Sequence, residues 1–220
     1  MIDAAAWEVY LVTDRAFAQG RSTWEIVRTA VKGGVSAVQL REKDLDTRAF
    51  YEEGLKIKDV LNEAGVPFII NDRIDVALAL DADGVHLGQS DMPASVARSI
   101  LGPDRIIGLS VEDPSHINDE AVSFVDYLGV SPVFLTGTKS ELTRAWGLDG
   151  LRQARTMTSL PLVGIGSIKL ENARSIIEAG ADCVAVVTAI VAAEDPEQAT
   201  RALVREVRAG KRHRRGADHG

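Results

Sequence analysis

The sequence lacks several features that identify common classes of protein. It contains a single cysteine, Cys183, so an internal disulfide is excluded. No apolar run approaches the roughly 20 residues that a membrane-spanning helix needs. The first residues, Met-Ile-Asp-Ala-Ala-Ala-Trp-Glu, lack the positive flank and apolar core of a secretory signal. We therefore expect a cytoplasmic protein that does not contact membranes.

The chain also lacks a positive charge excess and several catalytic fingerprints. Its net charge is −7, whereas a general nucleic-acid binder needs a broad basic surface, so any phosphate site must be local. No Ser-His-Asp, zinc or dinucleotide motif is present. His86 lies within an apolar run, which favours a hydrogen-bonded barrel residue over a metal ligand. None of the histidines has metal-ligand spacing: His86, His116, His213 and His219.

What the chain does contain is a regular alternation of apolar runs and amphipathic segments. Apolar runs bounded by turn residues predict eight strands, near 8–13, 35–41, 67–71, 83–87, 105–110, 126–131, 161–165 and 182–188. Apolar residues at three- and four-residue spacing predict helices over 23–33, 47–65, 73–81, 93–102, 114–122, 148–158, 169–179 and 195–209. Eight strand–helix units favour a single-domain (β/α)8 TIM barrel over residues 1–209, because an open doubly wound sheet usually has fewer strands and a glycine-rich first turn.

The last residues, 210–220, form a basic segment with almost no apolar side chain. Their composition predicts a disordered tail. A basic run could also contact nucleic acid or attract anionic substrates, but a solvated terminus is the favoured interpretation.

The second predicted strand ends in a polar cluster, Gln39-Leu-Arg-Glu-Lys43. Because side chains alternate along a strand, Val38 and Leu40 would face the helices while Gln39, Arg41 and Lys43 face the barrel interior. An unpaired guanidinium is costly to bury, and an anionic ligand would remove that cost. The alternative is that Arg41 pairs with a buried carboxylate from another strand.

Two carboxylates, Asp72 and Asp91, follow the third and fourth predicted strands. These strands are neighbours in a barrel, and barrel enzymes place catalytic groups at their C-terminal ends. Mg²⁺ takes one or two protein carboxylates and completes its shell with water and phosphate oxygens, so the pair predicts a magnesium site. Either aspartate could instead cap the following helix, and capping is compatible with metal binding through the other oxygen.

Two further segments are candidates for phosphate binding. The stretch 131–140 is rich in hydroxyls and contains Lys139, so it predicts a loop that covers a ligand, although a lone loop lysine is usually solvated. Gly166 follows the seventh predicted strand, and Val187 and Thr188 end the eighth, where barrels often bind phosphate. A tight turn would require the glycine as well.

Together these clusters resemble one family, thiamine phosphate synthase. The resemblance extends from Tyr10 to Pro196. It rests on Gln39-Leu-Arg-Glu-Lys43, Val66-Pro-Phe-Ile-Ile-Asn-Asp72, Asp83-Gly-Val-His-Leu-Gly-Gln-Ser-Asp91, Ile107-Gly-Leu-Ser110, Thr136-Gly-Thr-Lys139 and Val163-Gly-Ile-Gly166.

The resemblance implies a transferase that joins hydroxymethylpyrimidine diphosphate to thiazole phosphate and releases pyrophosphate. It implies that Asp72 and Asp91 bind Mg²⁺ and that the partners are these small-molecule substrates; a homo-oligomer is left open. The implied catalytic residues are Arg41, Lys43, Lys139 and Ser110. The implied substrate-binding residues are Gln39, Arg41, Lys43, Asn71 and Ser110 for the pyrimidine diphosphate, with Lys139, and Thr136, Thr138, Gly166, Val187 and Thr188 for the thiazole phosphate.

The chain departs from the usual family pattern at three positions. Ser167 replaces a glycine after the seventh strand, Leu135 replaces a proline in the covering loop, and Thr188 replaces a serine. These changes concern the phosphate site and the stiffness of the loop, and they leave the implied reaction type unchanged.

Two other functions compete with the transferase. A related thiazole tautomerase would need a proton-transfer residue and no metal pair, but here Val111-Glu112 stands where that enzyme would place its histidine. A regulator that binds thiamine precursors without catalysis is the rival from another class. The retained Asp72, Asp91 and Lys139 favour the transferase over both.

Overall fold

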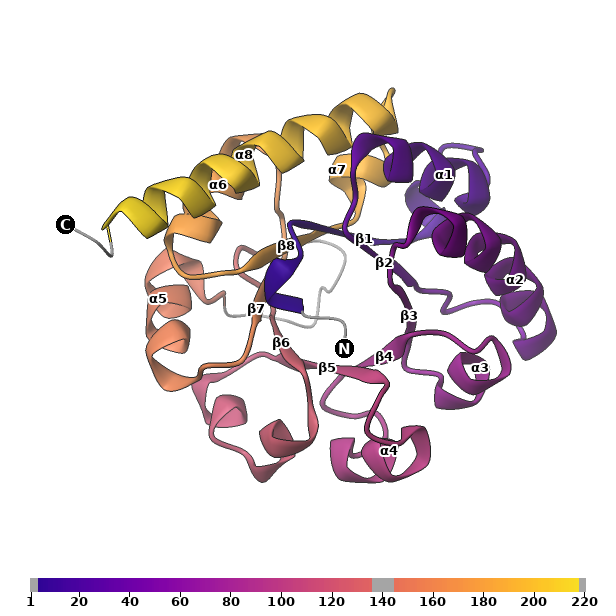
Figure 1. Cartoon of the computed structure of the whole chain (residues 1–220), viewed down its shortest axis with the longest axis horizontal. Helices are drawn as coiled ribbons and strands as arrows, with labels where there is room; N and C mark the ends of the chain where they lie inside the picture. Colours follow the sequence, from indigo (N-terminus) through magenta and orange to yellow (C-terminus); the bar gives the residue numbers. More distant parts are fainter. Residues whose placement is uncertain (1–3, 136–144, 218–220) are drawn as a thin grey trace.

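The computed structural model describes residues 4–135 and 145–217, and its centre is a closed barrel of eight parallel strands in chain order (Figure 1). Strand β8 pairs with β1 and closes the ring. The TIM-barrel prediction is confirmed. The strands are β1 Val9–Val12, β2 Ala37–Leu40, β3 Phe68–Asn71, β4 Gly84–Leu87, β5 Ile106–Val111, β6 Tyr127–Val130, β7 Leu162–Ile165 and β8 Cys183–Val186.

The strands are apolar because helices cover their outer side and packed side chains fill most of the interior. Only Asn71, His86 and Ile165 of the strand residues are less than fully buried. All three line the cavity at the C-terminal end of the barrel. The partial exposure of these strand residues therefore marks the side on which ligands can enter.

The helices surround the ring and begin and end at recognisable capping residues. Helix α1 starts after Ser22, which forms a capping box with Glu25, and it ends at Gly34 in the left-handed conformation. The α-helices are α1 Thr23–Gly33, α2 Thr47–Ala64, α3 Ile74–Ala79, α4 Ala94–Leu101, α5 Gly147–Met157, α6 Leu170–Glu178, α7 Thr188–Val191 and α8 Pro196–Ala217. Four short 3₁₀ helices complete the described elements: η1 Ala4–Ala6, η2 Arg15–Phe17, η3 Pro114–Ile117 and η4 Glu120–Phe124.

The predicted helix over 114–122 is wrong, because the structure has the two short 3₁₀ helices η3 and η4 there. The side chain of Asp113 accepts from the backbone N–H of Ser115, and that of Asp119 accepts from the N–H of Ala121. Each aspartate therefore starts a new turn, and the local bonds replace a continuous helix.

The predicted disordered tail is also wrong for residues 210–217, because α8 continues to Ala217. The Lys211 ammonium donates to the carbonyl oxygens of Ala5 at 3.2 Å and Trp7 at 2.7 Å. The Arg214 guanidinium donates to the Asp182 carboxylate at 2.8 Å. Composition suggested solvation, but these basic groups have partners far away in the sequence.

The N-terminal segment closes one end of the barrel. In Figure 1 the 3₁₀ helix η1 lies over the centre of the ring of strands. Trp7 is buried at 3% exposure, and its ring meets the rings of Tyr10 and Tyr127 edge-on, with centroids 5.2 and 5.4 Å apart. Ligands must therefore enter from the opposite end. Among the helices in the described ranges, none has the length and apolar character needed to cross a bilayer.

Candidate active site

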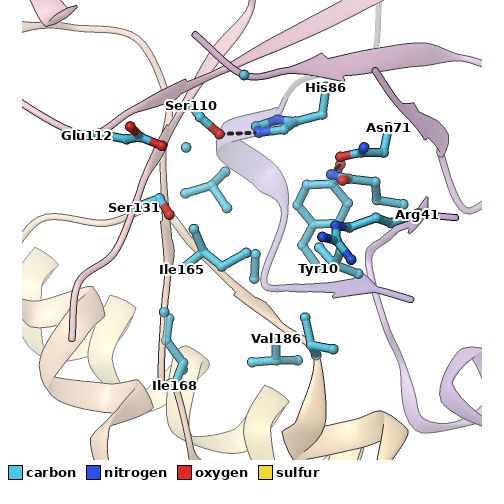
Figure 2. A pocket seen from close by; sticks show the side chains of 18 of the residues that line it. Tyr10, Arg41, Asn71, His86, Ser110, Glu112, Ser131, Ile165, Ile168 and Val186 are labelled. Atoms are coloured by element: carbon cyan, nitrogen blue, oxygen red, sulfur yellow. Dashed lines mark hydrogen bonds between the residues drawn. The ribbon is translucent and has the colours of Figure 1, made fainter. Parts of the chain in front are cut away.

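The C-terminal ends of the strands surround a cavity of about 530 Å³. In TIM-barrel enzymes this end carries the active site. Figure 2 shows side chains from several strands converging on the cavity, with Arg41 and Asn71 on one side and Ser110, Glu112 and Ser131 on the other. The cavity is therefore the candidate active site.

The polar cluster at the end of strand β2 faces this cavity. Gln39, Arg41 and Lys43 all line it, as predicted. The Arg41 guanidinium also pairs with the carboxylate of Asp14 at 3.0 Å. The alternative, that Arg41 pairs with a carboxylate from another strand, is therefore confirmed in part. The carboxylate belongs to Asp14, which follows strand β1. The Lys43 ammonium lies 2.6 Å from the Asp72 carboxylate. Two cations thus face the cavity with carboxylates at their sides.

Asp72 and Asp91 are neighbouring carboxyl groups that shift each other's pKa. Burial opposes the charge on Asp72, but the bonds from Lys43 and Asp91 outweigh it and lower the pKa of Asp72. Burial, together with the hydrogen bond to Asp72, raises the pKa of Asp91. Two carboxylates of this kind share a proton or need a cation between them.

Neither aspartate caps a helix, so the capping interpretation is wrong. The N-cap residues of α3 and α4 are Arg73 and Pro93, and neither has a side-chain capping bond. Asp72 adopts a left-handed backbone with φ 59°, and Asp91 accepts from the backbone N–H of Gly88 at 2.6 Å. Both carboxylates line the cavity. The donor set fits Mg²⁺, which needs few protein carboxylates and completes its shell with ligand oxygens.

Ser110 lies on β5 and its hydroxyl is 2.9 Å from Nε2 of His86 on β4, which Figure 2 draws as a dashed line. His86 is hydrogen-bonded within the barrel, as predicted. The side-chain amide of Gln89 donates to the Ser110 carbonyl at 2.6 Å. Ser110 is 5% exposed, so both its backbone and its side chain are fixed beside the cavity. Glu112 also lines the cavity.

The loops after β7 and β8 form another part of the wall. Gly166 has φ 112°, and a Cβ there would lie 2.7 Å from Cβ of Pro132, so only glycine fits. Ser167 has φ 48°, and its hydroxyl donates to the Leu135 carbonyl at 2.6 Å. Two of the three departures from the family pattern therefore contact each other. Val187 and Thr188 line the same cavity, with Thr188 exposed.

The remaining predicted site residues, Thr136, Thr138 and Lys139, lie outside the described residues, so their roles stay predictions. Of the others, the structure brings together Gln39, Arg41, Lys43, Asn71, Asp72, Asp91, Ser110, Gly166, Val187 and Thr188 around one cavity.

Sequence reasoning missed three residues of the site: Asp14, which holds Arg41, and Tyr10 and Tyr127, which line the cavity floor. One signal was present for Tyr127 and for the neighbouring His86. Gly108 and Gly129 stand inside otherwise apolar strands, and a glycine in a strand often marks close approach of another group.

Fold and site together define a TIM-barrel enzyme that gathers cations, carboxylates and a glycine turn at one end of its strands. The family model described as "Thiamine monophosphate synthase" matches residues 9–190, and the chain belongs to that family.

Relatives and solved structures agree with this assignment. A thiamine-phosphate synthase of Albidiferax ferrireducens is 54% identical over 191 residues, covering 87% of each chain. One from Syntrophomonas wolfei is 52% identical over 197 residues, covering 90% of this chain and 94% of the relative. The structure of thiamine phosphate pyrophosphorylase from Pyrococcus furiosus superposes with a TM-score of 0.86 at 38% identity, covering 94% of this chain and 98% of that chain.

Proposed function

We propose that the protein joins hydroxymethylpyrimidine diphosphate to thiazole phosphate, forming thiamine phosphate and releasing pyrophosphate. The observation that carries this proposal is the convergence of Lys43, Asp72 and Asp91 beside Arg41 at the mouth of one cavity. Cations next to a carboxylate pair suit a diphosphate that arrives with a divalent metal ion. The thiamine-phosphate synthases among the relatives support the same reaction.

The main task of the protein in this reaction is to stabilise the leaving group. The bond between the methylene carbon and the diphosphate oxygen breaks, and its electron pair leaves with pyrophosphate. The aminopyrimidine ring stabilises the methylene cation, and the thiazole nitrogen then supplies the electron pair of the new C–N bond. Arg41 and Lys43 face the departing negative charge, with Lys139 assigned the same task. No protein nucleophile or general base is required.

Asp72 and Asp91 would hold Mg²⁺, and when bound this ion would neutralise part of the diphosphate charge. Lys43 is paired with Asp72 at 2.6 Å in the present structure. With the diphosphate in the cavity, phosphate oxygens would offer the Lys43 ammonium group additional acceptors. Lys43 therefore orients both the aspartate and the substrate.

The second substrate is placed on the other side of the cavity, with its phosphate against the loops after β7 and β8. The φ of 112° at Gly166 supports this placement, because such a backbone can direct N–H groups toward an anion. Val187 and Thr188 would complete the site, together with Thr136 and Thr138 of the covering loop. Gln39, Asn71 and Ser110 are left to bind the pyrimidine and its diphosphate.

The test is formation of thiamine phosphate from the two substrates, with Mg²⁺ and then with EDTA. The proposal predicts product that depends on the metal ion. If thiazole phosphate binds but no product forms, a tautomerase or a regulatory binder explains the site better. Isomerisation of a thiazole phosphate without added pyrimidine would identify the tautomerase.

A cytoplasmic location and the absence of nucleic-acid and membrane partners belong to the same proposal. The net charge of −7 supports it, because phosphate recognition is then confined to the cavity.

A further inference from the structure

Five side chains form one continuous set of hydrogen bonds across the cavity floor. The Gln39 amide Nε2 donates to the Tyr10 hydroxyl at 2.9 Å, and the Tyr10 and Tyr127 hydroxyls lie 3.0 Å apart. The Tyr127 hydroxyl is 2.9 Å from Nδ1 of His86, and Nε2 of His86 is 2.9 Å from the Ser110 hydroxyl. We call these five residues the polar network. Its two ends are the residues assigned to the pyrimidine.

The fold makes room for this network. A Cβ at Gly108 would lie 2.0 Å from Cζ of Tyr127, and one at Gly129 would lie 3.0 Å from Cε1 of His86. The His86 and Tyr127 rings stack with centroids 5.5 Å apart. Trp7 packs edge-on against both tyrosines from the closed end of the barrel. The rings are therefore held from several sides and cannot easily reorient.

The bonds of the network have one direction. Because the Tyr10 oxygen accepts from Gln39 and Tyr10 is buried, its own O–H needs an acceptor, and that acceptor is the Tyr127 oxygen. By the same argument the Tyr127 O–H donates to Nδ1 of His86. The other ring nitrogen of His86 then carries the proton and donates from Nε2 to the Ser110 oxygen. Burial raises the pKa of both tyrosines, so both hydroxyl groups keep their protons and can donate.

This direction fixes what the two ends offer to a ligand. Since Gln39 donates through Nε2, its Oε1 is left as an acceptor, and no described residue donates to it. Since Ser110 accepts from His86, its own O–H is left as a donor. An acceptor at one end and a donor at the other suit a ligand that donates to Gln39 and accepts from Ser110, as an aminopyrimidine can do through its amino group and a ring nitrogen. An oxo group in place of the amino group would set a second acceptor against Gln39 Oε1, which would then have no donor.

We propose that Tyr10, Tyr127 and His86 are positioning residues that fix the direction of the hydrogen bonds and thereby select an aminopyrimidine over the corresponding oxopyrimidine. This inference rests on the proposed function, because it concerns the pyrimidine substrate of the same site. A site whose buried groups are left unpaired by the wrong ligand discriminates strongly against that ligand.

The first test is calorimetric binding of hydroxymethylpyrimidine diphosphate and of its oxo counterpart to wild type, Tyr127→Phe and the matched control Tyr51→Phe. Tyr51 lies on α2 and does not line the cavity. Wild type and the control should favour the amino compound by about 100-fold or more, as expected for buried groups left unpaired. Tyr127→Phe should lose most of this preference and retain its affinity for thiazole phosphate. An unchanged preference in Tyr127→Phe, or none in wild type, would overturn the proposal.

A second test measures the wild-type protein itself, so its result does not depend on the stability of a variant. The ¹⁵N NMR spectrum of histidine-labelled wild type, with His86 assigned from the signal missing in His86→Asn, reports its tautomer. The expected result is a proton on Nε2 and none on Nδ1. A proton on Nδ1 would overturn the inferred direction. Turnover without amino selectivity would contradict this inference alone, and amino selectivity without thiamine phosphate formation would contradict the proposed function alone.

Discussion

Two adjacent residues after strand β2, Arg41 and Glu42, point to opposite faces of the barrel wall. Arg41 lines the cavity, whereas the Glu42 side chain is 1% exposed and lies against Arg15, with Oε2 3.1 Å from the Arg15 Nε. The other oxygen of Glu42 has no hydrogen-bond partner among the described residues. Because side chains alternate along an extended chain, Arg41 faces the ligand cavity and Glu42 is buried on the opposite side of the wall. The unpaired oxygen of the buried Glu42 carboxylate lowers the stability of the fold.

Arg41→Ala tests the leaving-group assignment. Loss of one preorganised cation should lower kcat by about 100-fold, a magnitude typical of removing one electrostatic contact to a transition state. The variant should remain folded, because the lost pair with Asp14 is one contact at the cavity edge. Steady-state kinetics and thermal unfolding measure the two effects. Arg152→Ala removes a similar pair at the exposed surface of α5 and should change neither.

Glu42→Gln tests the cost of the buried carboxylate through pH. Burial, offset in part by Arg15 and increased by Glu53, raises the pKa of Glu42 above its usual 4.5. The folded state therefore holds this proton more tightly than the unfolded state. The free energy of unfolding of wild type, relative to Glu42→Gln, should rise as the pH falls from 8 toward about 4.5.

Urea unfolding at several pH values measures this difference. Glu25→Gln is the control of opposite sign, because hydrogen bonds from Ser22 lower the pKa of Glu25. The advantage of wild type over Glu25→Gln should therefore hold down to about pH 4.5 and shrink as the pH falls further. A flat difference for Glu42→Gln would mean that the carboxyl is not destabilised by burial.

Among the helices, α8 connects the C-terminal part of the chain with the N-terminal segment through hydrogen bonds. It packs against α1 and α6, and Figure 1 shows it running along the outside of the barrel beside α6 and α7. Its Lys211 donates to backbone carbonyls of the segment that closes the barrel, and its Arg214 shares Asp182 with Arg155. A C-terminal helix with such contacts contributes to the stability of the barrel.

Truncation of α8 tests this contribution. Removing residues 210–220 deletes the bonds of Lys211 and Arg214, so the free energy of unfolding should fall by about 1–3 kcal/mol, the range for a few lost bonds. Removing only residues 216–220 keeps both side chains and should have little effect. Urea unfolding compares the two truncations. Equal stabilities would support the disordered tail that composition alone predicts.

At the scale of the whole molecule, the sequence predicts the barrel and the site entrance well, because both depend on local pattern. Apolar runs locate the strands, and polar residues such as Lys43, Asp72 and Asp91 stand where the runs end. Parallel strands then bring these ends together without further information.

The sequence does not reveal side-chain pairs between residues that are far apart in the chain. Tyr10 and Tyr127 are separated by 117 positions and meet only because β1 and β6 face each other across the barrel. The pair of Arg15 and Glu42 and the contacts of Lys211 are of the same kind. Periodicity carries no signal for such pairs, whereas the glycines at 108 and 129 carry a weak one.

In the proposed reaction, the carboxylate pair and its neighbouring cations drive departure of pyrophosphate. The most direct measurement follows thiamine phosphate and pyrophosphate together in one Mg²⁺-containing reaction, for wild type and for Asp72→Asn with Asp91→Asn. We expect equal amounts of the two products from wild type, and rates at least about 100-fold lower in the double variant. A folded double variant that forms both products at the wild-type rate would exclude this role for the two aspartates.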